Sequence, residues 1–190
     1  MVGSERRSPG VLGLVKPHHG VTPAIDSSVF VAEGAVVIGD VAIGPESSVW
    51  YGSVLRGDVN FIRVGRESNI QDACVLHVHQ KTLPCFVGDQ VTLGHGVILH
   101  ACTVKDRCLI GIGTTVLDGA VVGPDAIVAA GSLVTPGTVI PPGTMVMGRP
   151  AKAVRDLTQK DLDWILESAG NYVRYAAEAV AAAAKGEGTR

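Results

Sequence analysis

Large aliphatic residues recur at every sixth position through most of the chain. In the longest unbroken run, from Val104 to Val146, the residue four positions after each member is small or compact, beginning with Cys108 and ending with Pro150. A period of two is typical of an ordinary strand and a period of 3.6 of a helix, whereas six fits neither. The series has twenty positions: Ile25, Val31, Val37, Ile43, Val49, Leu55, Val64, Ile70, Leu76, Val87, Leu93, Leu99, Val104, Ile110, Val116, Val122, Val128, Val134, Ile140 and Val146.

A six-residue unit supplies one short strand and one turn, so three units complete one triangular coil. Stacked coils pair as parallel strands about 4.8 Å apart, with the large residue and the small one both directed inward. Glycine, proline and aspartate at intermediate positions, as in Gly39-Asp40 and Gly123-Pro124-Asp125, turn the corners. The sequence therefore predicts an all-β solenoid of between six and seven coils. The alternative is a β-sandwich of short alternating strands.

The period defines three segments of the chain. Residues 1–20 form an N-terminal extension, and the solenoid is expected over residues 21–152, since the pattern ends at Pro150. Thr158 and Asp161 then have the spacing of a helix-capping pair, and apolar residues follow at helical spacing as far as Ala184. Residues 153–190 are thus predicted to hold one C-terminal helix along the solenoid and a disordered tail from Lys185.

Three breaks in the period point to a functional site. The step from Leu55 to Val64 is nine residues, and the step from Leu76 to Val87 is eleven, which leaves an irregular loop. The step from Leu99 to Val104 is one residue short. Local departures from a regular pattern tend to fall at functional sites, and the reactive side chains of this chain gather beside these breaks.

Two histidines occupy equivalent positions in neighbouring coils. His77 follows Leu76 directly and His100 follows Leu99 directly, with one complete coil between them. The two imidazoles should therefore stack on one side of the solenoid, about 5 Å apart, which suits two ligands of one metal ion. The alternative is that each is a satisfied surface residue.

His95 is expected to reach such an ion only from another copy of the chain. It lies five residues before His100, so an extended chain places it up to roughly 16 Å away, around a corner. Three imidazoles with one open position are a ligand set of catalytic zinc. A threefold oligomer would build three such sites, each from His77 and His100 of one chain and His95 of the next. His79 is a possible spare ligand, whereas His18 and His19 are expected to be structural or exposed.

Polar residues cluster one coil before the histidines: Arg56, Asp58, Asn69, Gln71 and Asp72. One interpretation is that they form corner turns and an ion pair at an interface. The other is that they surround the metal and fix its bound water.

Composition narrows the classes of function. The 190 residues have a net charge of −2, which argues against a nucleic-acid partner, and no apolar run long enough to span a membrane. Three Phe, three Tyr and two Trp against 24 Gly imply a narrow core of Val, Ile and Ala. The four cysteines form no CxxC pair, and no secretory signal precedes the repeat, so reduced thiols in a cytoplasmic protein are expected.

The combined motifs resemble the gamma-class carbonic anhydrases and their close homologues. The similar stretches are Arg56-Gly57-Asp58, Asn69-Ile70-Gln71-Asp72, His77 and Gly94-His95-Gly96-Val97-Ile98-Leu99-His100, within a likeness that runs from about Val21 to Lys152 and into the helix. The resemblance implies a left-handed parallel β-helix of hexapeptide repeats, assembled as a homotrimer with a metal at each subunit interface.

The resemblance also implies roles for individual residues. His77, His95 and His100 match the metal ligands, with His95 contributed across the interface, and Arg56 and Asp72 match residues that pair between subunits. Gln71 and Asp58 match residues near the metal-bound water, Asn69 matches one near the site, and Tyr172 is similar to a helix tyrosine that lines the pocket.

The implied reaction is the reversible hydration of CO2 to bicarbonate by a metal-bound hydroxide, with zinc as the metal and Fe2+ or Co2+ as alternatives that imidazole also accepts. The sequence departs from the archetype at Val59, where that protein has a glutamate, and in the loop from Val78 to Phe86, which contains no carboxylate. The archetype uses these positions to carry the proton away, so slow turnover is compatible with the sequence.

Two other functions stay open. One is a hexapeptide acyltransferase or a thioesterase acting on coenzyme A esters, because Gly148-Arg149-Pro150-Ala151-Lys152 resembles the exit segment of such transferases. Those transferases generally need one general-base histidine and no metal triad. The other is a catalytically weak trimeric assembly subunit.

Overall fold

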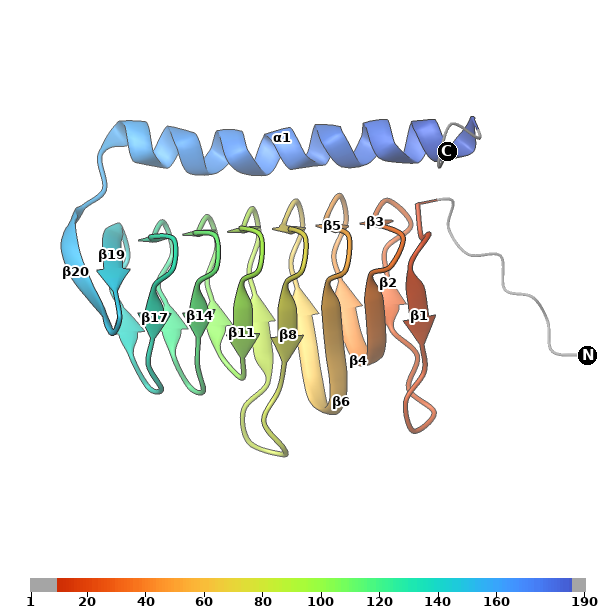
Figure 1. Cartoon of the computed structure of the whole chain (residues 1–190), viewed down its shortest axis with the longest axis horizontal. Helices are drawn as coiled ribbons and strands as arrows, with labels where there is room; N and C mark the ends of the chain where they lie inside the picture. The colour runs from red at the N-terminus through yellow and green to blue at the C-terminus, as the bar shows by residue number, and fades with distance from the viewer. Residues whose placement is uncertain (1–9, 186–190) are drawn as a thin grey trace, which may run out of the picture.

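The six-residue period folds into short parallel strands stacked along one axis, which confirms the predicted solenoid. The structure is a computed structural model and describes residues 10–185, which form about seven turns of a left-handed parallel β-helix (Figure 1). Nineteen of the twenty positions in the aliphatic series are buried, and Ile25 is partly buried against the same core. This main core contains no aromatic side chain among the described residues, as the composition predicted.

Three faces surround the core. The helix face carries β3 (Phe30–Val31), β5 (Ser48–Val49), β7 (Asn69–Ile70), β10 (Thr92–Leu93), β13 (Leu109–Ile110), β16 (Ile127–Val128) and β19 (Thr144–Gly148). The histidine face carries β8 (Val75–His77), β11 (Ile98–His100), β14 (Thr115–Val116) and β17 (Leu133–Val134). The third face carries β9 (Cys85–Val87), β12 (Thr103–Val104), β15 (Val121–Val122) and β18 (Val139–Ile140).

Two long strands join the histidine face to the third face. They are β4 (Val36–Ile43) and β6 (Val54–Val64), and β6 pairs with β8 through Val54–Arg56 and with β9 through Ile62–Val64. The extra residues of the first break lie within β6, where the register against β4 shifts after Gly39. The extra residues of the second break form the loop between β8 and β9, which projects below the coils (Figure 1).

The N-terminal extension takes part in the first coil. Its strand β1 (Leu14–Lys16) pairs in parallel with β4, as does β2 (Ala24–Ile25), and Val11 bridges to Val31. These pairings cover backbone groups that the first coil would otherwise leave open.

One strand was missed at the other end. β20 (Ala151–Asp156) runs antiparallel to β19 and crosses residue 152, where the sequence placed the end of the solenoid. Five of its six residues are exposed, so it carries no hydrophobic pattern from which it could be predicted.

The C-terminal helix α1 (Gln159–Ala184) confirms the predicted helix and lies along the helix face (Figure 1). Thr158 caps it in a full capping box with Asp161, and the buried residues of the helix itself are Ile165, Ala169 and Ala176. Within residues 10–185, α1 does not combine the length and apolar composition of a membrane-crossing helix. Apart from Lys185, the expected disordered tail lies outside the described residues.

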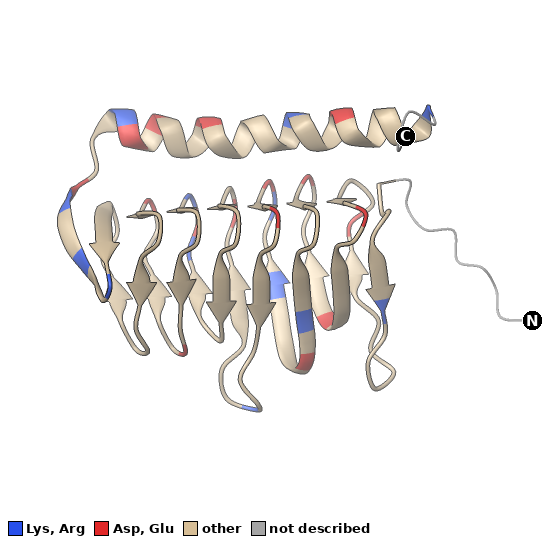
Figure 2. Ribbon diagram, in the orientation of Figure 1, with Lys and Arg blue, Asp and Glu red and all other residues tan. Residues whose placement is uncertain are grey.

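Charged residues lie mainly at the corners between strands and along α1, with both signs interspersed (Figure 2). The four cysteines are free and buried, and burial raises the pKa of the Cys74 and Cys108 thiols to about 12. Both thiols are therefore protonated at neutral pH, in agreement with their place in the core.

Candidate metal centre

The parallel ladder brings His77 and His100 together. They are the last residues of β8 and β11 and are direct partners in the register of the two strands. Their ring centroids lie 5.2 Å apart, close to the predicted spacing, and Nδ1 of His77 is 3.2 Å from Nε2 of His100. Arg56 precedes His77 in the same column of the ladder.

Each of these two imidazoles has a carboxylate at its other nitrogen. Nε2 of His77 lies 3.1 Å from Oδ1 of Asp58, and Nδ1 of His100 lies 2.5 Å from Oδ1 of Asp118. Because a carboxylate accepts, these contacts place the ring protons on the two outer nitrogens. The two facing nitrogens are then both acceptors, an unfavourable contact unless a proton or a metal ion lies between them.

The spacing of the facing nitrogens fits a shared ion. Two nitrogens bound to one tetrahedral zinc at about 2.05 Å lie about 3.3 Å apart. Metal-binding histidines commonly donate their second N–H to a carboxylate, which fixes the tautomer and the ring orientation. The residues present therefore fit a divalent metal, although two imidazoles alone do not complete a site.

Local electrostatics favour a neutral His77 beside an ionised Asp58. Burial lowers the pKa of His77, and the positive charge of Arg56 acts in the same direction, against the hydrogen bond to Asp58 and the negative charge of Asp58. Burial alone would raise the pKa of Asp58, but hydrogen bonds from Arg56 and His77 outweigh it and lower the pKa below its ordinary value. A neutral imidazole is the form that binds metal.

His95 occupies a different part of the histidine face. It lies at the corner between β10 and β11, its side chain is 48% exposed, and its Nδ1 is 2.7 Å from Oδ2 of Asp72. Among residues 10–185 of one chain, no three His, Cys, Asp or Glu side chains lie close enough to hold one ion. The single chain thus holds a pair of imidazoles and a separate third one, each with a carboxylate partner.

Three other predicted site residues, Gln71, Asn69 and Tyr172, lie on the same side of the β-helix as Asp72. Asn69 begins β7 and Gln71 directly follows that strand; both are buried, and Nε2 of Gln71 donates to Oδ1 of Asn69 over 3.1 Å. Tyr172 on α1 packs against Trp50, with ring centroids 5.4 Å apart. Burial raises the pKa of Tyr172, and the charge of Asp72 raises it further.

Arg56 and Asp72 do not pair within the chain. Arg56 instead binds Asp58, while Asp72 binds His95. The remaining histidines lie apart from the pair. Nδ1 of His79 is occupied by Thr82 and the Gln80 carbonyl in the loop after β8. The rings of His18 and His19 meet edge to face, with centroids 4.2 Å apart, beside a hollow of about 250 Å³ that Asp58 also lines.

Asp118 is the residue that sequence reasoning missed. It lies at the corner that follows β14, one position beyond Leu117, because Leu99 pairs with Val116 in the ladder. Its place one coil after His100, next to the position that stacks on it, was a usable signal, but Asp118 falls in an unbroken part of the period.

Comparison with known proteins places the chain among relatives that cover most of it. No family model matches. The chain is 51% identical over 160 residues to "Gamma carbonic anhydrase 2, mitochondrial" of Arabidopsis thaliana, an alignment of 82% of this chain and 58% of that protein, so the chain spans little more than half the length of this relative. It is 47% identical over 150 residues to "Probable carbonic anhydrase" of Methanocaldococcus jannaschii, covering 79% of this chain and 94% of the relative.

A solved structure agrees with the fold. The crystal structure of a putative acetyltransferase of Bacillus cereus superposes with a TM-score of 0.87 at 42% identity, over 88% of this chain and 97% of that one. It is a hexapeptide-repeat β-helix, like the structure described above. Together with the near full-length match to the archaeal relative, these likenesses show that the chain belongs to the gamma carbonic anhydrase family.

Proposed function

We propose that this chain is a metal-dependent carbonic anhydrase, which interconverts CO2 and bicarbonate at sites built between the subunits of a homotrimer. The observation that carries the proposal is the pair of facing acceptor nitrogens on His77 and His100, each ring fixed from behind by a carboxylate. A cation bound between the two nitrogens would remove the repulsion between their lone pairs.

The proposed ion is Zn2+, and Fe2+ or Co2+ would suit the same imidazoles. When bound, such an ion supplies a nucleophile at neutral pH, because coordination lowers the pKa of water to about 7, as in zinc carbonic anhydrases. Asp58 and Asp118 hold the rings of His77 and His100 in the binding tautomer, and Gln71 orients the attacking oxygen through its side-chain amide. Tyr172 bounds the substrate pocket from α1.

The two halves of the site lie at opposite edges of the histidine face, which supports assembly between subunits. His77, His100 and their carboxylates lie at the edge next to the third face, whereas His95 and Asp72 lie at the corner next to the helix face. In a closed threefold ring, the first edge of each chain meets the second edge of its neighbour. His95 would then complete the ligand set, with Arg56 free to pair with Asp72 of the next chain.

The surface between these edges suits an interface. Val36, Val54, Val75 and Ile98 are successive partners in the ladder and form an outward row on the histidine face. Val75 is 39% exposed and Ile98 is 41% exposed. A contiguous apolar row beside polar edges is typical of a protein–protein contact.

Charge placed on this row tests the assembly. We expect Ile98→Lys to dissociate the trimer in sedimentation velocity, because three lysines would meet in a buried contact. Val139→Lys is the matched control, since Val139 is 69% exposed on the third face and should tolerate the charge. A wild-type protein that sediments as a monomer, or an Ile98→Lys variant that stays trimeric, contradicts the proposed assembly.

Metal content and CO2 hydration on one preparation test the activity. The proposal predicts about one divalent ion per chain and stopped-flow hydration that His100→Ala removes. Metal with no measurable hydration would favour the assembly subunit instead, an alternative suggested by the carboxylate-free loop after β8.

The acyltransferase alternative is supported by the name of the Bacillus cereus structure and by the segment Gly148–Lys152. In the structure this segment forms the turn between β19 and β20, with an exposed Arg149. Acyl transfer or thioester hydrolysis on acetyl-coenzyme A, kept by a metal-free His77→Ala variant, would favour it.

A cytoplasmic location, with other copies of the same chain as the partner, completes the proposal. The four reduced cysteines support the location, and the plant relative carries a mitochondrial name. Cell fractionation of the native source measures it directly.

A further inference from the structure

Polar side chains interrupt the row of apolar residues beneath α1. The outward residues Asn69, Thr92, Leu109 and Ile127 are successive partners along the helix face. Leu109 and Ile127 pack against Ile165 of α1, whereas Asn69 and Thr92 are 1% and 3% exposed. Burying such polar side chains costs free energy unless they are hydrogen-bonded, so Asn69 and Thr92 both need hydrogen-bond partners.

These partners form one chain of hydrogen bonds that ends at Gln71. Nε2 of Gln71 donates to Oδ1 of Asn69 over 3.1 Å, and Nδ2 of Asn69 donates to Oγ1 of Thr92 over 2.9 Å. Oγ1 of Thr92 in turn donates to Oγ of Ser168 on α1 over 3.1 Å. The helix is thereby connected to the Gln71 amide through two side chains of the β-helix.

The direction of the chain follows from a neighbouring carbonyl. Nδ2 of Asn69 also faces the carbonyl oxygen of Val91 at 3.5 Å, and a carbonyl can only accept. This contact favours the orientation in which Oδ1 of Asn69 is turned toward Gln71. Nε2 of Gln71 is then used by Asn69, and Oε1 is the atom left to meet another group.

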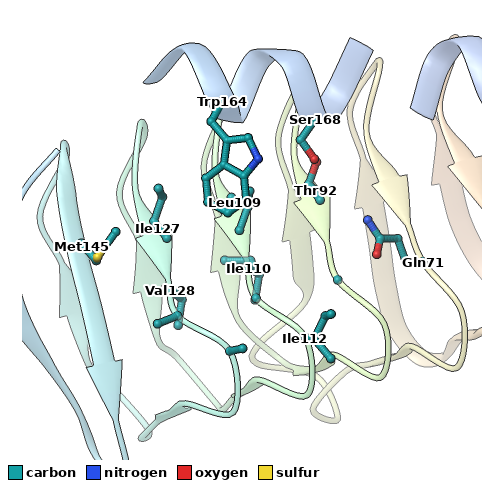
Figure 3. Close-up of a pocket in the computed structure, with 14 residues that line it drawn as sticks. Gln71, Thr92, Leu109, Ile110, Ile112, Ile127, Val128, Met145, Trp164 and Ser168 are labelled. Carbon is teal, nitrogen blue, oxygen red and sulfur yellow. The ribbon is translucent and has the colours of Figure 1, made fainter. Parts of the chain in front are cut away.

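The pocket beside Gln71 offers few polar side chains that could replace Asn69 as the hydrogen-bond partner of its amide. Gln71, Thr92 and Ser168 line one end of a pocket of about 380 Å³ between α1 and the coils (Figure 3). The other labelled side chains of this pocket are hydrophobic, Trp164 and Met145 among them. Loss of the Asn69 contact would therefore leave the amide without a ready replacement.

We propose that Thr92 and Ser168 are positioning residues that, through Asn69, hold the Gln71 amide so that its carbonyl oxygen accepts a hydrogen bond from the reacting oxygen. The inference rests on the proposed function, because it gives Gln71 a task in CO2 hydration. Neither Thr92 nor Ser168 contacts the reacting atoms.

The test compares Thr92→Val, which keeps the shape and removes the hydroxyl, with Thr92→Ser, which restores it. The chain has four glutamines, so selective 15N labelling yields few side-chain amide signals, and Gln71→Ala assigns one of them. In Thr92→Val we expect a shifted Gln71 amide signal with faster hydrogen exchange and a kcat about 3- to 10-fold lower, with unchanged metal content and trimer. Thr92→Ser should restore both readouts.

Thr103→Val is the matched control, because Thr103 lies on the third face, away from α1, and should change neither readout. An unchanged Gln71 signal in Thr92→Val overturns the inference whatever the activity. A shifted signal with wild-type kcat overturns the positioning role. A shifted signal in a protein that never hydrates CO2 leaves the hydrogen-bond chain standing and refutes the proposed function, so the two failures are distinguishable.

Discussion

Nδ1 of His77 lies 3.2 Å from Nε2 of His100 because the two residues are direct partners on neighbouring parallel strands. The hexapeptide ladder therefore sets how far apart the two side chains lie along the axis of the solenoid. The two carboxylates behind the rings then decide which nitrogens face each other.

The carboxylate behind His100 should set metal affinity. We expect Asp118→Asn to weaken binding of Zn2+ by about 10- to 100-fold, because the amide no longer holds the His100 tautomer as firmly. Competition with a chromophoric chelator measures the change. Asp125→Asn is the control, since Asp125 pairs with Arg107, and Asn tolerates its positive φ of 54°. Equal affinity in Asp118→Asn and the wild type would show that this contact does not tune the ligand.

The fold and the histidine pair were predictable from the sequence for one physical reason. A strict period makes position in space a simple function of position in the chain, so the residues after Leu76 and Leu99 had to stack. Asp118 lies one position beyond Leu117, the residue that stacks on His100, but it falls in an unbroken stretch of the period, which gave no reason to single it out. β20 could not be predicted from the sequence, since an exposed antiparallel strand shows no burial pattern.

The side-chain contacts at the corners between strands were harder to predict from the sequence. Arg56 bonds to Asp58 two residues away, and Asp72 bonds to His95 in the next coil. Such contacts depend on rotamers and on the close approach of corners, which a hydrophobic period does not encode.

Alanine substitution should raise the free energy of unfolding at one glycine and lower it at another. Gly170 lies exposed within α1 with no atom near an added Cβ, so Gly170→Ala should raise the free energy of unfolding by about 0.5–1 kcal/mol. At Gly111 an added Cβ would lie 2.4 Å from the backbone nitrogen of Ala130, so Gly111→Ala must displace the next coil and destabilise the protein. Denaturant unfolding at fixed protein concentration measures both, and a stabilised Gly111→Ala would contradict the close packing of these corners.

The cap of α1 should make stability depend on pH in acid. Hydrogen bonds from Arg155 and then from Thr158 hold the pKa of Asp161 well below its ordinary value of 3.8. A carboxylate with a lowered pKa in the folded state contributes stability above its unfolded pKa and loses it as the pH falls through the folded value. The wild type should therefore melt above Asp161→Asn at pH 6, with a difference that shrinks as the pH falls below about 3.8.

Asp163→Asn is the control for the cap. Asp163 lies two residues further along the same helix and accepts a bond from Gln159 outside the capping box. Its melting difference from the wild type should be smaller at pH 6. A difference between Asp161→Asn and the wild type that grew on acidification would contradict the sign of this linkage.

The most direct test of a metal site shared between subunits combines two variant chains, each of which lacks one part of the ligand set. Co-expression of His77→Ala and His95→Ala chains with different tags, followed by purification on both tags, yields trimers that contain both kinds of chain. In any such trimer, one of the three interfaces joins an intact His77–His100 pair to an intact His95. Each variant alone should be nearly free of metal, and the mixed trimer should bind about one ion by elemental analysis. A mixed trimer as empty as its parents, or His95→Ala with full metal content, would contradict a site shared between subunits.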